Sequence, residues 1–437
     1  MSLHETMIGV RAVHFAATMM TTGVVFFVAF ISAPASLGNI APRVAESFRS
    51  RLSAIAWIGL ALSVFSGAAW LVLTARSMSE QPLVEVLSQG VIWTVLTQTH
   101  FGNDWLARLV FAGLLAGTLP QLLQARRNAP RWVVAAAVVL AAALVGSLTW
   151  AGHAIGASGF EGLIHPAADV LHLVAAAAWA GTLPLLALLL AAAEGNAASV
   201  AMMRAATLRF STLGIVSVGT LLATGIVNTW YLVGSVPALS GTPYGRLLIV
   251  KVAMFFGMVA LATVNRFRLT PQMASDKTAT AALGQLRRNA ALESLLGAGI
   301  VFIVAIMGTL PPASHAQHHP AYGAIPIGAA FVHIHTEQGM ADVTITPGRT
   351  GPAHATIRLW DADFEPLEAR EVTFTLTAPA AGSKPITRVA VQDADGAWKV
   401  DRIELSQPGN WMVTVAAVPG PTGRLVLDAP IVIEPER

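Results

Sequence analysis

Residues 163–193 read LIHPAADVLHLVAAAAWAGTLPLLALLLAAA. One charged residue, Asp169, and two histidines interrupt a run that otherwise consists mostly of Ala, Leu and Val. A helix needs about 20 apolar residues to cross the hydrocarbon core of a bilayer, because each residue advances it by about 1.5 Å. The stretch is therefore predicted to form a transmembrane helix.

Similar apolar runs recur throughout the first part of the chain. Of the 437 residues, 54% are hydrophobic and only 12% are charged, whereas roughly 25% of residues are charged in ordinary soluble domains. Residues 76–103 are interrupted by polar residues and are predicted to form an extracytoplasmic loop with a short helix. The apolar runs predict about eight transmembrane helices, near residues 8–35, 52–75, 104–125, 132–154, 163–193, 206–234, 246–267 and 289–311.

Basic residues predict the orientation of these helices. The second connection contains one basic residue, Arg76, and the fourth contains none. Connections rich in Lys and Arg remain in the cytoplasm, so the odd-numbered connections are predicted to be cytoplasmic and both termini periplasmic. The small net charge of +3 gives no indication of nucleic-acid binding. The odd-numbered connections contain Arg43, Arg49, Arg51, Arg126, Arg127, Arg131, Arg204, Arg209, Arg266, Arg268, Lys277, Arg287 and Arg288.

The sequence pattern changes after residue 313. Residues 314–325 form a His-containing linker rich in Pro and Ala, and from residue 326 short segments alternate between apolar and polar positions, as in ADVTITP and EVTFTLTA. Turn sequences such as PGRTGP, DADG and QPGN separate them. Alternation with regular turns is typical of an antiparallel β-sandwich. We therefore predict a transmembrane domain over residues 1–313 and an immunoglobulin-like β-sandwich over residues 326–437.

Ionisable side chains inside the predicted spans are the candidate functional residues. Each costs at least about 2.5 kcal/mol to insert on translocon scales, so its presence calls for a reason. His14 lies in the first span and His153 at the end of the fourth. In the fifth, His165, Asp169 and His172 are spaced i, i+4 and i+7 and so lie on one helical face. By the predicted topology, all five lie in the outer half of the membrane.

These residue types point to a transition metal. The chain contains no cysteine, which excludes thiolate metal sites and disulfides. Imidazole suits copper, the thioether of a Met in a span suits Cu(I), and a nearby carboxylate can orient an imidazole ligand. The alternative for each histidine is a hydrogen-bonding plug between helices, which is the interpretation we favour for His165. The predicted membrane site comprises His14, His153, Asp169, His172 and Met254.

A second group of histidines precedes and begins the predicted β-domain. The linker contains HAQHH, and the first predicted strand contains His333 and His335. Alternate residues of a strand point to the same face, so this pair is suited to binding Cu(II) or zinc. The alternative is that these histidines belong to a flexible region that binds metal only weakly.

Five segments of the predicted transmembrane domain form a pattern in this order: SLTWAGHA (147–154), ADVLHLVAAAAWAGTLPLL (168–186), RFSTLGIVSVGTLLATGIVNTW (209–230), YGRLLIVKVAMFF (244–256) and RRNAALESLLGAGIV (287–301). Together they resemble the copper resistance D (CopD) family. The segments ITPGRTGPAHATIRLWD (345–361) and QPGNWMVTV (407–415) are similar to the YtkA/FixH-like β-domain that is often fused to such proteins. His14, His153, Asp169 and His172 match positions at which the family has polar groups in its spans.

The resemblance implies a copper resistance or copper homeostasis protein of the bacterial inner membrane. It would receive periplasmic copper, with a CopC-type copper-binding protein as a candidate partner, and pass the ion inward. Two alternatives remain open: a b-type cytochrome in which His14, His153 or His172 bind haem, and a copper chaperone that does not transport. The sequence contains no P-loop or Ser/His/Asp grouping, so an enzyme is not predicted.

Overall fold

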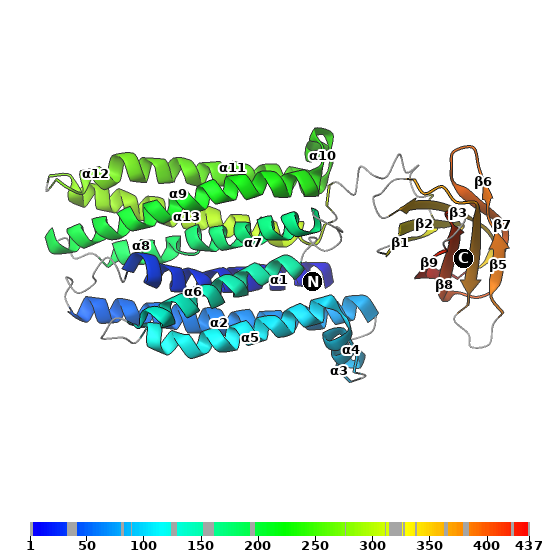
Figure 1. Cartoon of the computed structure of the whole chain (residues 1–437), viewed down its shortest axis with the longest axis horizontal. Coiled ribbons are helices and arrows are strands. Elements are labelled where there is room, and N and C mark those ends of the chain that lie inside the picture. The colour runs from blue at the N-terminus through cyan, green and yellow to red at the C-terminus, as the bar shows by residue number, and fades with distance from the viewer. Residues whose placement is uncertain are drawn as a thin grey trace. The chain divides into compact units, whose positions relative to one another are not determined.

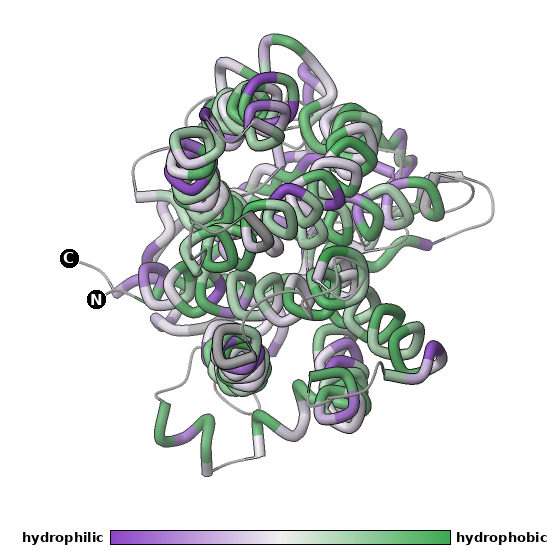
Figure 2. Tube along the Cα trace, turned by 90° about the vertical axis from the view of Figure 1, so that its left-hand side faces the viewer, coloured by the Kyte–Doolittle hydropathy of each residue, from purple (hydrophilic) through white to green (hydrophobic). Residues whose placement is uncertain are grey.

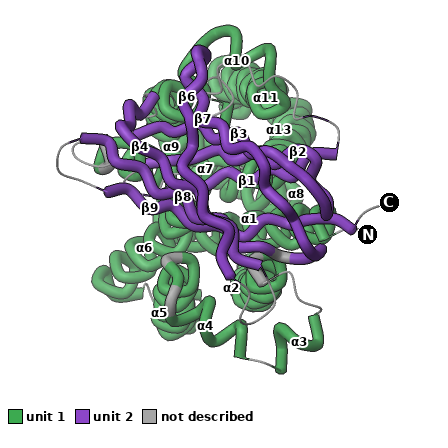
Figure 3. Tube along the Cα trace, turned by 90° about the vertical axis from the view of Figure 1, so that its right-hand side faces the viewer, with its two compact units in different colours: residues 1–317 green, residues 318–437 purple. Residues whose placement is uncertain are grey.

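The computed structural model describes residues 3–32, 42–79, 83–88, 90–123, 129–151, 161–192, 197–275, 277–310, 312–313, 326, 328–336, 339–361, 366–378, 384–420 and 424–435. The chain divides into two compact units, Met1–Gln317 and His318–Arg437 (Figures 1 and 3). Each unit contains a hydrophobic core of its own.

The first unit is entirely helical in its described part. Eight of the described helical segments are long and apolar enough to cross a membrane: Leu3–Ser32, Ala45–Ser77, Phe101–Leu123, Arg131–Trp150, Leu163–Ala191, Ser199–Val233, Pro243–Gln272 and Ala279–Met307. This confirms the predicted polytopic membrane fold. The elements are α1 (Leu3–Phe26), η1 (Phe27–Ser32), α2 (Pro42–Ser79), α3 (Leu83–Ser88), α4 (Val91–Gln98), α5 (His100–Leu123), α6 (Arg131–Gly146), η3 (Ser147–Ala151), α7 (Glu161–Trp179), α8 (Leu183–Ala191), α9 (Ala197–Val233), α10 (Val236–Gly241), α11 (Pro243–Val264), η4 (Asn265–Leu269), α12 (Thr270–Gln272) and α13 (Ala279–Met307).

Some helix boundaries differ from the predicted ones. Helices α9 and α13 begin at Ala197 and Ala279, well before the predicted starts near residues 206 and 289. Hydropathy detects the part of a helix that lies in hydrocarbon, whereas backbone hydrogen bonding continues into the polar residues beyond it. The predicted loop at 76–103 contains two short helices, α3 and α4, rather than one.

Helix α1 lies at the centre of the bundle, because it contacts α2, α6, α7 and α13. Hydrophobic residues predominate along the helices, with hydrophilic residues interspersed (Figure 2), and many large apolar side chains are exposed. Phe65 and Phe267, for example, each leave 73% of their surface uncovered by protein. Such side chains would be a liability in water but suit contact with lipid tails.

The second unit is a two-sheet antiparallel sandwich over residues 330–433, as predicted. One sheet has the order β1-β2-β3-β7-β6 and the other β5-β4-β8-β9, with buried side chains of both sheets forming the core. The strands in the described residues are β1 (Ala330–Thr336), β2 (Gly339–Thr346), β3 (Gly351–Asp361), β4 (Glu371–Thr377), β5 (Ile386–Val389), β6 (Val391–Gln392), β7 (Trp398–Leu405), β8 (Gly409–Val418) and β9 (Leu425–Ile433).

One short segment of the chain contributes strands to both sheets. Residues 386–392 begin as β5, which pairs with β4, and continue as β6, which pairs with β7 of the other sheet. Between them Ala390 is buried, and its N–H donates to the carbonyl of Val372. The segment therefore changes sheets at Ala390, a feature that local alternation in the sequence does not reveal.

Candidate functional site

His14 lies inside the helical bundle, on α1. Only 4% of its surface is exposed, and its Nδ1 lies 3.0 Å from the hydroxyl oxygen of Ser66 on α2. Its other ring nitrogen, Nε2, is buried and has no hydrogen-bond partner among the described residues. The ring packs edge-on against Trp70, with 5.6 Å between ring centroids. Serine thus holds one nitrogen of a buried imidazole and leaves the other available to a ligand.

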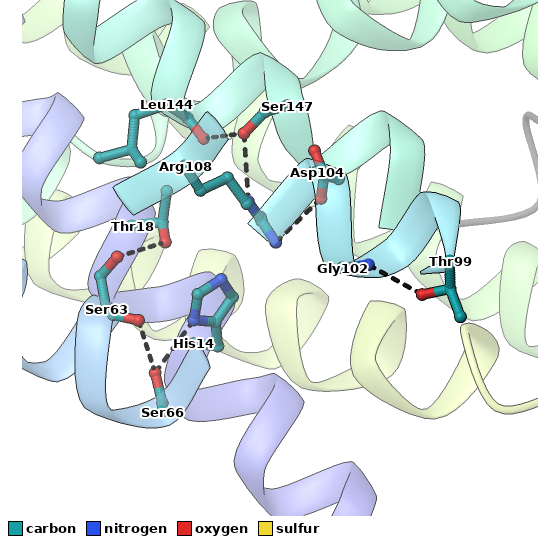
Figure 4. Close-up of polar contacts among 10 residues, drawn as sticks. All are labelled: His14, Thr18, Ser63, Ser66, Thr99, Gly102, Asp104, Arg108, Leu144 and Ser147. Carbon is teal, nitrogen blue, oxygen red and sulfur yellow. Dashed lines mark hydrogen bonds and ion pairs between the residues drawn. The ribbon is translucent and has the colours of Figure 1, made fainter. Parts of the chain in front are cut away.

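An ion pair on α5 lies beside this histidine (Figure 4). Arg108 Nη1 is 3.6 Å from the carboxylate of Asp104, and its Nε donates to Ser147 Oγ over 3.1 Å. Both charged side chains are nearly inaccessible. The sequence analysis did not single out this pair. The available signal was that Asp104 and Arg108 are the two charged residues of the third predicted span and are spaced i, i+4.

His172, Asp169 and His165 all face α9 from α7. His172 Nδ1 lies 3.0 Å from the hydroxyl oxygen of Thr224. Asp169 Oδ1 accepts a hydrogen bond from Asn228 over 3.1 Å, and the charge of Lys251 on α11 lies within electrostatic reach of Asp169. These three residues of α7 therefore form the helical face that their spacing predicted.

His165 has a structural environment of its own. Its ring stacks on Tyr231 of α9, with centroids 5.0 Å apart and an interplanar angle of 13°. This contact agrees with the structural role that we favoured for it.

His14 and His172 occupy corresponding positions in two sets of four spans. Each lies in the first span of its set, each directs Nδ1 to a hydroxyl on the second span, and in both cases that hydroxyl is 52 residues further along the chain. The third span supplies a cation within electrostatic reach, Arg108 for His14 and Lys251 for His172. The transmembrane unit thus contains two similar polar clusters, although no repeat was recognisable in the sequence.

The two remaining predicted ligands of the membrane site are His153 and Met254. His153 lies outside the described residues. Met254 is half-buried on α11, next to Gly299 of α13. Within the described part of the chain, no group of three or more His, Asp or Glu side chains lies close enough together to hold a metal ion. The structure therefore does not assemble the predicted set of membrane ligands into one closed metal site there.

In the β-domain, His333 is paired with a buried carboxylate. Its Nδ1 lies 2.6 Å from Asp342 Oδ1 on the neighbouring strand β2. Burial raises the pKa of Asp342 to about 7, opposed by the nearby positive charge of Arg358. A carboxylate on Nδ1 fixes the tautomer and the orientation of an imidazole ring. The sequence analysis did not identify Asp342, and the side chain of His335 lies outside the described residues.

Comparison with known proteins identifies the family. Residues 204–307 match the family described as "Copper resistance protein D", and residues 2–163 match "Copper resistance protein D-like, N-terminal domain". No solved structure matches the chain.

Three curated relatives are similar over most of their lengths. The chain is 34% identical to "Copper resistance protein D" of Pseudomonas syringae pv. tomato over 279 residues, which are 62% of this chain and 86% of the relative. It is 30% identical to "Inner membrane protein YebZ" of Escherichia coli (strain K12), over 70% of this chain and 98% of the relative. It is 23% identical to "Copper transport protein CutJ" of Bacillus subtilis (strain 168), over 94% of this chain and 71% of the relative.

The apolar helices and these relatives together describe a multi-pass inner-membrane protein connected with copper. The names of the relatives describe copper resistance, copper transport and an inner-membrane protein, and none describes an enzyme. The predicted resemblance is confirmed: the chain belongs to the copper resistance protein D family.

Proposed function

We propose that this protein binds copper from the periplasm in the outer half of its transmembrane domain and carries it across the inner membrane. The observation that supports this most directly is the buried Nε2 of His14, which has no partner among the described residues while Ser66 holds Nδ1. Leaving a buried polar atom without a hydrogen bond costs about 1–3 kcal/mol. A metal ion bound to Nε2 would offset that cost.

The charges near His14 are mixed. Arg108 and Arg11 both lie within electrostatic reach of His14 and would repel a cation, and Asp104, which lies 3.6 Å from the Arg108 guanidinium, offsets one of these two charges. In the second cluster, the charge of Asp169 lies within electrostatic reach of Lys251, and Asp169 and His172 are three residues apart on the same helix. In this proposal, His14 and His172 act as imidazole ligands of the two clusters, and His153 and Met254 are further candidate ligands.

Copper analysis of the purified full-length protein tests these ligands. We expect His14→Ala, His172→Ala and His153→Ala each to lower the amount of copper bound per protein. The matched control is His165→Phe, because the stacking of His165 on Tyr231 accounts for that histidine without a metal. Unchanged copper content in all three alanine variants would exclude the proposed ligands.

The same preparations distinguish the two alternative functions. A Soret absorbance band that is lost in the His14 or His172 variant would identify the protein as a b-type cytochrome. Copper uptake into sealed vesicles separates transport from a chaperone role, because a chaperone would bind the ion without accumulating it inside. Transport predicts uptake by the wild type and loss of uptake in the His14 and His172 variants.

The β-domain is proposed to receive copper before the transmembrane domain does. His333 is 39% exposed in its side chain, and Asp342 contacts its Nδ1 and fixes the orientation of the ring, so an ion from solution or from a periplasmic CopC-type protein can approach the imidazole. We expect His333→Ala and His335→Ala to reduce copper binding by the full chain at limiting copper. The exposed His354 on β3 provides a control histidine.

A further inference from the structure

A cavity of about 350 Å³ lies within the second set of spans, away from the histidine clusters. Its walls come from Trp179 at the end of α7 and from α8, α9, α11, η4, α12 and α13, and they are mostly apolar. Two charged side chains line it, Arg266 on η4 and Glu293 on α13. The described lining residues of the other elements are apolar or uncharged.

Glu293 is fully buried, with 0% of its surface exposed. Its Oε1 accepts a hydrogen bond from Asn265 Nδ2 over 2.6 Å, and Asn265 Oδ1 in turn accepts from Asn289 over 2.7 Å. Its Oε2 is buried and has no hydrogen-bond partner among the described residues. Two amides therefore position one oxygen of the carboxyl group, while the described part of the chain offers no hydrogen bond to the other.

Glu293 also has no ion-pair partner among the described residues. Arg266, the cation that lines the same cavity, donates to the hydroxyl of Ser211 over 2.7 Å instead. An ionised carboxylate without a cation is very costly in a low-dielectric interior, and such a group takes up a proton instead. This differs from Asp104, whose charge is offset by Arg108.

The backbone near the carboxyl group is unusual as well. Asn265, the donor to Glu293, begins the π-helical segment η4, and its carbonyl accepts a hydrogen bond from Thr270 Oγ1 over 2.7 Å. Short π-helical segments within α-helices occur frequently at functional sites. Here the π-helical segment places the side-chain amide of Asn265 in contact with the carboxyl group of Glu293.

We propose that Glu293 is a proton-binding site of the transmembrane domain, separate from the predicted metal ligands. Oε2 carries the proton, the Asn265–Asn289 pair holds Oε1, and the cavity gives the site room to exchange the proton through water or a small side-chain movement. By the predicted topology, this site lies in the half of the membrane next to the cytoplasm. Any role of the proton in driving copper transport would depend on the proposed function, whereas proton binding itself would not.

A hydrophobic carbodiimide tests the proposal without copper. A protonated carboxyl adds across a C=N bond of dicyclohexylcarbodiimide, its proton passing to nitrogen and its oxygen to carbon. Migration of the acyl group to nitrogen then leaves a stable N-acylurea that contains all atoms of both reactants. We would treat the purified full-length protein over a pH series and measure the modified fraction of each carboxyl-containing peptide by mass spectrometry.

We expect Glu293 to be modified, with a rate that falls as pH rises and by about tenfold per pH unit above its pKa. Asp104, which is paired with Arg108, should react more slowly. The substitution Glu293→Gln should abolish modification at residue 293. Asn265→Ala removes a donor that favours the ionised form, so labelling of Glu293 should persist to higher pH. Absence of modification at Glu293, or modification independent of pH, would overturn the proposal, and either result would leave the copper-binding experiments unaffected.

Discussion

At the scale of single residues, the two membrane histidines share one hydrogen-bonding arrangement. Ser66 holds Nδ1 of His14, and Thr224 holds Nδ1 of His172. A partner on Nδ1 restricts the orientation of the ring, so these hydroxyls would act as positioning residues for the proposed ligands. Their role can be tested separately from that of the histidines.

We expect Ser66→Ala and Thr224→Ala to weaken copper binding by about 10–100-fold, the usual cost of removing a partner of a metal ligand. Titration of the purified variants with copper measures this loss. Thr220→Ala is the matched control, because its hydroxyl bonds to the carbonyl of Val216 on the same helix. Equal affinities for the Thr224 and Thr220 variants would show that the hydroxyl near His172 does not position a ligand.

Asp342 makes the stability of the β-domain depend on pH. Burial raises its pKa from the usual 3.8 to about 7, so the folded domain holds this proton more tightly than the unfolded chain does. The stability that the folded domain gains by holding this proton is therefore fully present below about pH 4, and it is lost as the pH rises through about 7. Above that range, the folded domain must hold a buried negative charge.

We expect the urea midpoint of the β-domain to fall between pH 5 and pH 8, as followed by proteolysis of the full-length protein. Asp342→Asn cannot ionise and should show a smaller decrease. The exposed pair Asp393–Lys399 offers a control, because Asp393→Asn should leave the pH dependence of the wild type nearly intact. A wild-type midpoint that rises with pH would contradict the sign of this prediction.

At the scale of secondary-structure elements, two glycines determine how closely α1 approaches the turn between α7 and α8. A Cβ atom on Gly23 would lie 2.9 Å from the Cα of Gly181 and still nearer to its carbonyl group. A Cβ atom on Gly181 would lie 2.6 Å from the carbonyl oxygen of Met19. Small residues permit this close approach of membrane helices. The contact joins the first set of four spans to the second.

We expect Gly23→Ala to destabilise the transmembrane domain by about 1–3 kcal/mol, the typical cost of overpacking. Thermal unfolding in detergent would show it as a lower midpoint. Gly113→Ala on α5 is the control, since a Cβ atom there meets nothing within 4 Å and alanine is the better helix former. If both variants had the same midpoint of thermal unfolding, the close approach of Gly23 and Gly181 would not contribute to stability.

At the scale of the whole molecule, the orientation in the membrane decides which face receives copper. Basic residues predict that the connection between the sixth and seventh spans, which contains α10, is periplasmic. The same rule places the connection before α13 in the cytoplasm. Because the chain contains no cysteine, single introduced cysteines can report the side of each connection without background.

We expect Ser240→Cys, on α10, to react with a membrane-impermeant maleimide in intact cells. Lys277→Cys should react only after the inner membrane is permeabilised. Both native side chains are exposed, so access should not limit the reaction. The reverse pattern would invert the topology and place the histidine clusters nearer to the cytoplasm.

The amino-acid sequence alone was sufficient for the eight spans, the β-sandwich and the family. These depend on features that are local in the chain: apolar runs long enough to cross a bilayer, strict alternation along strands, and family segments in their order. The same local signals could not show that residues 386–392 change sheets, because that depends on which strand lies beside each half of the segment.

Only the tertiary structure decided which polar side chains meet. His14 contacts Ser66, Asn265 contacts Glu293, and the two residues of each pair come from different helices. Hydropathy indicates that a helix lies in the membrane but not how far it is rotated about its own axis or which neighbour it packs against. Those are determined by close contacts between residues far apart in the chain, such as Gly23 and Gly181, and they decide which buried nitrogen or oxygen is left without a partner.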